Sequence, residues 1–433
     1  MRLAALSLMF SCGDVPDWTI PVRIPSEQDP FEGADSLEVR VRRGGLVDAY
    51  RFGPGDRQLA LPAVSPGEVL DDLSLRALFG KDVTSFGRTP GPVVADEATD
   101  PMYFARVRFF AQTVEPPGPG GGFATRTEGG AWVATSEGLA RYDHATGEFH
   151  EVVALPGADR ARFATLESGR VVALQADAAL VFDGESFVVA QEGLPDATDS
   201  TVVAIPQDRI LVVGPDEIWV WDPALPDGPR FRDGLRPARV GASATFLQSR
   251  PLAVEVLPDR VLVAGGRDPT TGAEIAELLL VELTDPISVA VQAESLTAPR
   301  SDHAAIVVPE LPDNVWILGG RGAADALTDS VEAFRVLGIA EHTLAVDPLF
   351  RPRANGAAAA LPGGDILLVG GETDPPEDAV LTERYLWYLG AGAARLADSL
   401  PAPVARPGTT FLDDGSLLVA GGGNCAIYVP DPL

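Results

Sequence analysis

The chain has 433 residues, with 62 acidic side chains against 33 basic ones and a formal net charge of −29. This acidic balance argues against nucleic-acid binding, because recognition of a phosphate backbone needs a basic surface. The length exceeds one ordinary domain, and the 46% of hydrophobic residues suffices for a folded core. The acidity predicts a soluble, self-repelling surface, and we expect a monomer.

The N-terminus, residues 1–12, predicts a lipoprotein-type signal segment. Arg2 precedes the apolar run 3–10, which is followed by Ser11 and Cys12. The run is too short to span a bilayer as a helix but has the length of a signal-peptide core. A small residue before Cys12 resembles the lipobox of bacterial lipoproteins, which implies acylation of Cys12 and membrane attachment through lipid only. The alternative is a buried N-terminal strand with an inert cysteine.

Residues 15–113 predict a small β-sandwich domain. Segment 35–43 alternates apolar and polar residues, as a half-buried strand does, and segments 57–64 and 73–79 repeat the pattern between turn residues. The proline- and glycine-rich stretch 115–122 marks a linker to the rest of the chain.

Residues 123–433 carry a repeat. Five apolar strands run into a glycine, and these glycines are spaced 51, 54, 51 and 51 residues apart, at Gly214, Gly265, Gly319, Gly370 and Gly421. A period near fifty with four strands per unit is typical of a β-propeller, in which each repeat is one blade. Two weaker units end at Thr135 and Gln175. The sequence therefore predicts an all-β, seven-bladed propeller, with six blades as the alternative.

The last unit ends after its third strand, which would leave an open sheet edge. Segment 104–114 alternates as a strand should and lies just before the first repeat. We expect it to supply the missing strand and close the ring. The alternative is that it is the last strand of the preceding domain.

The glycine-ended strands, with the repeat opening Arg300–Ala305 and the glycine-ended motif Leu412–Gly422, resemble kelch repeats over residues 198–433. The first unit, 129–149, is instead similar to propeller repeats of bacterial sensor regulators. Both resemblances imply a fold and leave the activity open, because propellers carry many unrelated functions.

Four arginines precede opening strands, at Arg239, Arg300, Arg353 and Arg406, and His303 follows the second of them. In a propeller the first strand of each blade lines the channel, so these side chains could converge on an anionic ligand through bidentate contacts. The alternative is a structural brace in which each arginine pairs with an aspartate of the adjacent blade.

A sandwich followed by kelch-like blades resembles the galactose oxidase architecture, which implies a copper site of histidines and tyrosines. The four histidines, His144, His150, His303 and His342, show no metal-ligand spacing, and the sequence offers no catalytic motif. We therefore expect no catalytic residue, no metal site and no cofactor. The other cysteine, Cys425, lies at the start of a third strand, where we expect a buried thiol.

These observations predict a non-enzymatic lipoprotein of the cell envelope that acts as a binding scaffold for a protein or polysaccharide. It would be anchored to the outer membrane or cell surface, with secretion as the alternative. Two other functions stay open: a carbohydrate-recognising propeller, or a galactose-oxidase-like enzyme without recognisable copper ligands.

Overall fold

The computed structural model describes residues 2–9, 18–56, 58–61, 64–65, 67–225, 228–229, 231–235, 237–251, 256–337, 339–342, 347–388 and 391–432. Apart from two short 3₁₀ helices, η1 (Ala323–Asp325) and η2 (Pro376–Val380), the regular structure in these ranges is β-strand. Neither helix is long and apolar enough to cross a bilayer, nor is any other helix in these ranges.

The N-terminal part forms one eight-stranded sheet with the order β4-β3-β7-β8-β10-β2-β1-β5. The strands are β1 (Arg2–Met9), β2 (Trp18–Ile24), β3 (Ser36–Arg43), β4 (Leu46–Phe52), β5 (Gln58–Ala60), β7 (Asp72–Phe79), β8 (Asp82–Arg88) and β10 (Met102–Arg106). A separate pair is formed by β6 (Val69–Leu70) and β9 (Val93–Val94).

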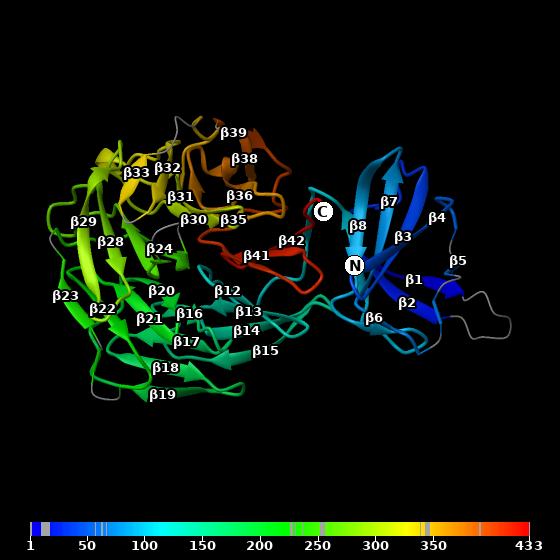
Figure 1. Ribbon diagram of the computed structural model, residues 1–433, viewed down its shortest axis with the longest axis horizontal. Helices are drawn as coiled ribbons and strands as arrows, with labels where there is room; N and C mark the ends of the chain where they lie inside the picture. The colour runs from blue at the N-terminus through cyan, green and yellow to red at the C-terminus, as the bar shows by residue number, and fades with distance from the viewer. Residues whose placement is uncertain are drawn as a thin grey trace.

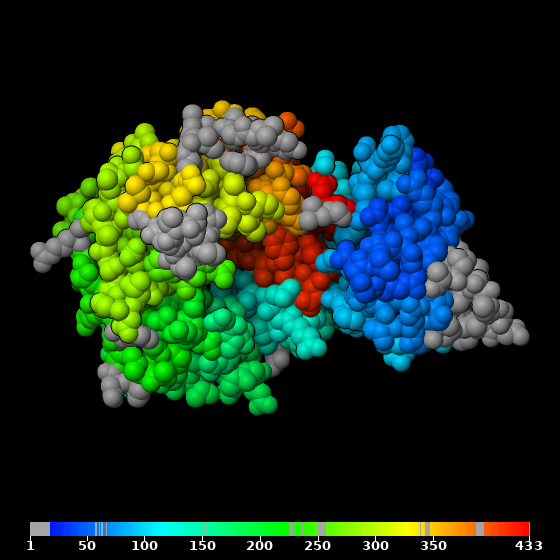
Figure 2. Space-filling view, viewed as in Figure 1, coloured from blue at the N-terminus to red at the C-terminus, as the bar shows by residue number. Residues whose placement is uncertain are grey.

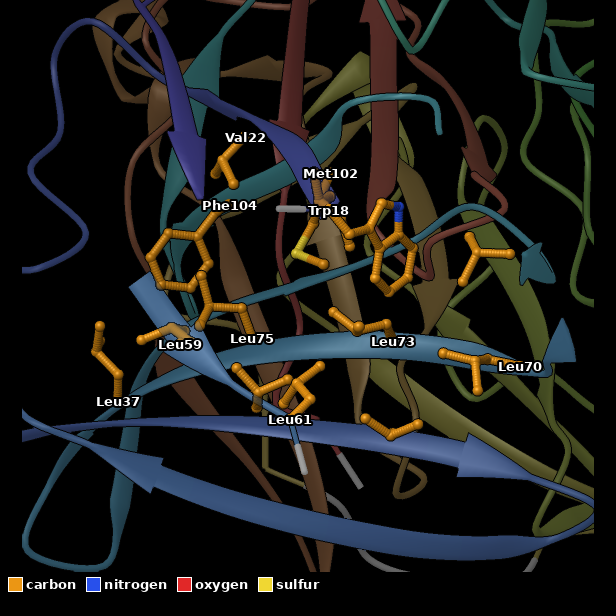
Figure 3. Packing of buried hydrophobic residues seen from close by; sticks show 14 of the residues in the cluster. Trp18, Val22, Leu37, Leu59, Leu61, Leu70, Leu73, Leu75, Met102 and Phe104 are labelled. Carbon is orange, nitrogen blue, oxygen red and sulfur yellow. The ribbon is translucent and has the colours of Figure 1, made fainter. Parts of the chain in front are cut away.

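One cluster of buried apolar side chains packs against this sheet and forms the core of the N-terminal part (Figure 3). Leu37 of β3, Leu75 of β7, Val22 of β2 and Leu59 of β5 all belong to it and are buried. Fully burying one such side chain stabilises the fold by roughly 1.5–3 kcal/mol. Because strands near both ends of the sheet order share the cluster, the sheet curls around it. The expected two-layer sandwich is thus one sheet by its hydrogen bonds.

The segment expected to be a signal core is strand β1. It pairs antiparallel with β2 and parallel with β5. Its pairing agrees with the strand of the alternative interpretation and does not test cleavage or lipid attachment. Cys12 lies outside the described residues, so its acylation stays a prediction.

The rest of the described chain forms seven four-stranded sheets, numbered I to VII here. Sheets I to III follow one another without insertions and consist of β12 (Ala124–Thr127), β13 (Gly130–Thr135), β14 (Gly138–Asp143) and β15 (Glu148–Ala154); β16 (Arg162–Thr165), β17 (Val171–Gln175), β18 (Ala178–Phe182) and β19 (Phe187–Gln191); and β20 (Thr201–Ile205), β21 (Arg209–Val213), β22 (Glu217–Trp221) and β23 (Phe231–Gly234).

Sheets IV to VI have longer loops after the second strand. They consist of β24 (Ser243–Leu247), β27 (Arg260–Ala264), β28 (Glu277–Glu282) and β29 (Ser288–Ser295); β30 (Ala304–Val308), β31 (Leu311–Leu318), β32 (Val331–Val336) and β33 (Ala340–His342); and β35 (Ala357–Ala360), β36 (Ile366–Val369), β38 (Glu383–Tyr388) and β39 (Ala391–Leu396). Two short pairs lie in the connections of these sheets: β25 (Arg250–Pro251) with β26 (Val256–Leu257), between β24 and β27, and β34 (Arg353–Ala354), just before β35, with β37 (Glu372–Thr373), between β36 and β38.

Sheet VII joins two distant parts of the chain. It contains β40 (Gly408–Phe411), β41 (Leu417–Gly421) and β42 (Asn424–Tyr428), and its fourth strand is β11 (Phe110–Gln112), which pairs antiparallel with β42. Of the segment 104–114, residues 104–106 belong to β10 in the N-terminal sheet. The segment therefore contributes to both parts of the molecule.

The sheets are arranged in a ring (Figure 1). The innermost strands of sheets II to VII lie beside one another in sequence order, and β12 of sheet I lies beside β40 of sheet VII. Figure 1 shows β15, β19, β23, β29, β33 and β39 on the outer rim. The N-terminal sheet lies against the ring at the C-terminal strands, as the space-filling view shows (Figure 2).

Candidate functional site

Three of the four candidate arginines form structural braces inside the ring. Their side chains are fully buried, and each pairs with a glutamate at the start of the third strand of its own sheet. The pairs are Arg239 with Glu277, Arg300 with Glu332, and Arg353 with Glu383. This corrects the expected ligand-binding ring for these three residues, because their guanidinium groups are already bonded and have no access to solvent. The brace partner also differs from the expectation. An aspartate of the adjacent blade was expected, whereas the observed partner is a glutamate of the same sheet.

The braces share one geometry. The second strand of each of these sheets is followed by two consecutive glycines, called the glycine pair here. In each brace, the arginine Nη1 donates to the carbonyl oxygen of the first of these glycines, over 3.3 Å from Arg239 to Gly265, 3.2 Å from Arg300 to Gly319 and 3.1 Å from Arg353 to Gly370. The charge-assisted bonds therefore tie the chain entering a sheet to that sheet's second and third strands.

The glycine pairs are needed for the same junction. Gly265, Gly319 and Gly370 have φ values of +61°, +64° and +59°. A Cβ atom on Gly265 would lie 2.4 Å from the carbonyl oxygen of Arg300, and one on Gly370 would lie 2.3 Å from that of Val404. Only glycine allows this backbone conformation and this approach of the next repeat. The repeat signal in the sequence is thus a packing requirement between neighbouring sheets.

His303 is also a structural residue. It is buried, and its Nε2 lies 2.8 Å from Ser243 Oγ on the innermost strand of the preceding sheet. Burial, with the charge of Arg300 as a smaller cause, lowers the pKa of His303 to about 3. The side chain is therefore neutral at physiological pH, which corrects its expected place in an anion site.

Arg406 occupies a different position in its repeat from the three braces. The carbonyl oxygens of Arg300 and Arg353 each accept a hydrogen bond from the second glycine of the pair in the preceding sheet. Before sheet VII the equivalent acceptor is the carbonyl oxygen of Val404, which bonds the N–H of Gly371 over 2.9 Å. Arg406 lies two residues later and is exposed. It is thus the one candidate arginine of the four whose side chain reaches solvent.

The position of Arg406 is a special one in every repeat from IV to VII. Gly241, Asp302, Asn355 and Arg406 each lie two residues before an innermost strand, with φ values of +65°, +52°, +54° and +46°. The backbone N–H of Asp302 donates to Gly241 over 2.8 Å, and that of Asn355 donates to Asp302 over 2.8 Å. These left-handed residues bring the loops of successive sheets together where the innermost strands begin.

A polar network lies on these loops. We call it the hub network, and it consists of Arg267, Asp302, Arg321, Asp325, Asn355 and Glu372. Arg321 is its centre: Nε lies 3.7 Å from Asp302 Oδ2, Nη1 lies 3.4 Å from Asp325 Oδ2, and Nη2 bonds Glu372. Asn355 Nδ2 donates to Glu372 Oε1 over 2.9 Å. Three repeats therefore share one set of contacts.

The charges of the network nearly cancel. Arg267 pairs with Asp325 over 3.6 Å, so two guanidinium groups face three carboxylates, and the positive charge of Arg406 also acts on Asp302. Burial raises the pKa of Asp302 although the neighbouring arginines oppose this shift. Glu372 and Asp325 stay exposed. The network thus presents donors and acceptors to solvent without a strong net charge.

The residues that directly follow the glycine pairs also belong to the repeat. Arg267, Arg321 and Glu372 each follow a glycine pair directly. The backbone of each pairs with the residue that directly follows the brace arginine: Arg267 with Val240, Arg321 with Ser301 and Glu372 with Ala354. The repeat in the sequence therefore extends one residue past the glycine pair.

The remaining histidines lie apart from this network. His144 is buried against Asp414, His150 is exposed beside Thr146, and His342 contacts Glu332 and Glu294. Within the described ranges, no three His, Cys, Asp or Glu side chains are placed to hold a metal ion. Cys425 is buried, and burial raises the pKa of its thiol.

No protein-family model and no curated protein matches the sequence. Solved structures do match. A fungal alcohol oxidase of the AA5 family in complex with copper is 13% identical, with a TM-score of 0.54 and coverage of 74% of this chain and 75% of that one. Streptogramin B lyase is 12% identical, with a TM-score of 0.50 and coverage of 74% and 96%. At such identities the likeness shows the fold alone: a β-propeller type.

Proposed function

We propose that the chain is a non-enzymatic binding scaffold of the cell envelope, with a kelch-like propeller of seven blades and a sandwich-like N-terminal domain. The hub network carries this proposal. Arg321 comes from one repeat and Asn355 and Glu372 from the next, and Arg267 of the preceding repeat joins them through Asp325, at the start of the innermost strands. The arginine brace has the same composition in sheets IV to VI, whereas the side chains of the hub network differ from repeat to repeat, as those of a binding site do.

The partner that fits this chemistry best is a polysaccharide. Neighbouring hydroxyl groups of a sugar both donate and accept hydrogen bonds, and planar carboxylates and guanidinium groups can bind them in pairs. The hub network offers both kinds of group side by side, with Glu372 and Asp325 open to solvent. Its small net charge suits a hydroxyl-rich surface better than a highly charged one.

Retardation of the full chain in native gels that contain dextran, pullulan or laminarin, three uncharged polysaccharides, tests this partner class. We expect at least one polysaccharide to retard the protein, and Arg321→Met and Glu372→Gln to weaken the retardation. Arg170→Gln is the matched control, because Arg170 pairs with Asp208 over 3.0 Å in a turn at the opposite end of the innermost strands. Equal retardation of all variants, or none of the protein, would contradict the proposal.

The location is proposed separately. A lipid on Cys12 would hold the propeller at the outer membrane or cell surface. Metabolic palmitate labelling of the wild-type protein and Cys12→Ser, followed by fractionation, tests it. We expect label and membrane association only with the cysteine. An unlabelled protein whose N-terminal sequence begins at Met1 would instead support retention of β1 in the mature chain.

A further inference from the structure

A pocket of about 290 Å³ lies between the N-terminal sheet and sheet VII. One wall is the polar face of β3, β7 and β8, and the other comes from the turn 414–416 and from residues 429–432. The volume is near the lower end of ordinary ligand pockets, about 300–1,000 Å³. The pocket is therefore sized for a small molecule.

The sheet register gathers four arginines on that wall. Arg40 of β3 lies opposite Ser74 of β7, and Ser74 lies opposite Arg88 of β8. Because side chains two residues apart share a face, Arg42 lies on the same face as Arg40, and Arg76 on the same face as Ser74. All five residues line the pocket. Like charges this close in a sheet are unfavourable without an opposite charge between them.

The carboxylates of the pocket balance only part of this charge. Asp414 Oδ2 lies 2.8 Å from His144 Nε2, and its Oδ1 accepts hydrogen bonds from Ser416. Asp431 bonds Arg108 over 2.7 Å and Arg384 over 3.1 Å. These two acidic groups are committed to partners outside the arginine wall.

The arginines themselves differ in their partners. Arg42 lies 3.5 Å from Asp72, and Arg40 lies 2.6 Å from Glu38. Arg88 has no carboxylate within ion-pair distance among the residues the structure describes. The wall therefore carries an excess of positive charge on a chain that is strongly acidic.

We propose that this pocket binds a small polyanion, a ligand that carries phosphate or carboxylate groups, with Arg40, Arg42, Arg76 and Arg88 as its donors. Guanidinium groups bind both kinds of anion through two parallel hydrogen bonds. Burial and the nearby charge of Arg40 lower the pKa of Arg76, and an anion in the pocket relieves the second effect. Ser74 supplies a hydroxyl in the same row.

The ligand would also hold the two parts of the molecule together. The arginines belong to the N-terminal sheet, whereas Asp414, Ser416 and Pro430 belong to the ring. A ligand that binds only the assembled form stabilises it in proportion to the logarithm of its concentration over Kd. Anion binding should therefore raise the melting temperature of the whole chain.

Isothermal titration of the full chain with pyrophosphate and with citrate, at matched ionic strength, tests the proposal. We expect one site for at least one of these anions, and at least tenfold weaker binding by Arg88→Gln and Arg42→Gln. Binding of pyrophosphate alone assigns a phosphate ligand, and binding of citrate alone a carboxylate. Equal affinity of Arg88→Gln and the Arg170→Gln control, or binding of neither anion, would overturn it.

The result is independent of the proposed polysaccharide site. Glu372→Gln alters the hub network and should leave anion binding unchanged, while Arg88→Gln should leave polysaccharide retardation unchanged. Both Arg42 and Arg88 are partly exposed, so their variants should fold, and near-ultraviolet circular dichroism verifies this.

Discussion

His144 Nε2 lies 2.8 Å from Asp414 Oδ2, and this buried contact joins the first sheet of the ring to the last. His144 directly follows β14, and Asp414 lies in the turn between β40 and β41. Arg23 of the N-terminal sheet donates to the carbonyl oxygen of His144 and lies 3.1 Å from the Tyr142 hydroxyl. Ring closure and the seat of the N-terminal sheet thus meet at one place.

Asp414→Ala should destabilise the chain by about 3 kcal/mol, because it leaves buried polar partners without a bond. Burial opposes ionisation of Asp414, but the charge of His144 and the hydrogen bonds from Ser416 lower its pKa. Its stabilising effect is therefore present above about pH 4 and is lost as the pH falls through the lowered value. Urea unfolding at pH 7 and pH 2.5 measures this, because the difference between the wild type and Asp414→Ala should shrink at the lower pH, with Asp159→Ala as an exposed control. An equal loss in both variants at pH 7 would refute the role.

Glu383→Gln should cost about 3 kcal/mol, because it leaves the buried Arg353 guanidinium without its counter-charge. Glu217→Gln is the matched control: Glu217 also begins a third strand, but it pairs with the exposed Arg232, so we expect a loss below about 1 kcal/mol. Adding Arg353→Met to Glu383→Gln should recover part of the stability. Thermal and urea unfolding of the wild type, the single variants Glu383→Gln, Arg353→Met and Glu217→Gln, and the double variant test the brace, and additive losses in the double variant would contradict it.

His303→Asn should flatten the acid side of the stability profile. The folded-state pKa of His303, lowered to about 3 by burial and by the charge of Arg300, lies below the ordinary value of 6.5. The folded chain therefore loses stability relative to the unfolded chain as the pH falls from 6.5 toward 3. Melting temperatures across this range should decline less steeply in His303→Asn than in His150→Asn, which alters an exposed histidine. Parallel profiles would mean that His303 is protonated without cost.

Phe110→Ala should weaken the sheet that β11 completes. The Phe110 ring is buried, its centroid lies 4.9 Å from that of Tyr428, and its backbone N–H donates to Asp398 over 2.9 Å. Removing a buried phenyl ring costs about 3 kcal/mol or more. Amide hydrogen exchange in β42 should accelerate, whereas Phe79→Ala, at an exposed site, should leave it unchanged. Unchanged exchange in both variants would show that β11 does not hold β42.

The sequence predicted the repeating sheets well because glycine has one physical reason to recur. The backbone of the next repeat packs directly against the first glycine of each pair, so a side chain at Gly265, Gly319 or Gly370 would clash with it. The arginine positions were harder to read. Arg406 was aligned with Arg300 by residue type, but Val404 occupies the equivalent backbone position. Residue type alone does not reveal a shift of two residues in a linker.

The pocket arginines were missed for another physical reason. The alternation of apolar and polar residues in segment 35–43 places Arg40 and Arg42 on the polar face of the strand. From the sequence alone, such a face is expected to contact solvent. Part of that face lies opposite sheet VII. A pattern along one strand reports which residues share a face, but the partner that covers the face comes from more than three hundred residues later.

The central claim is that the hub network, rather than the four arginines taken together, is the binding surface of the ring. Native-gel retardation by the uncharged polysaccharides dextran, pullulan and laminarin, compared between Arg321→Met and Arg170→Gln, tests it most directly. We expect at least one polysaccharide to retard the protein, Arg321→Met to weaken this at least tenfold in apparent affinity, and Arg170→Gln to leave it unchanged. Equal retardation of both variants would contradict it.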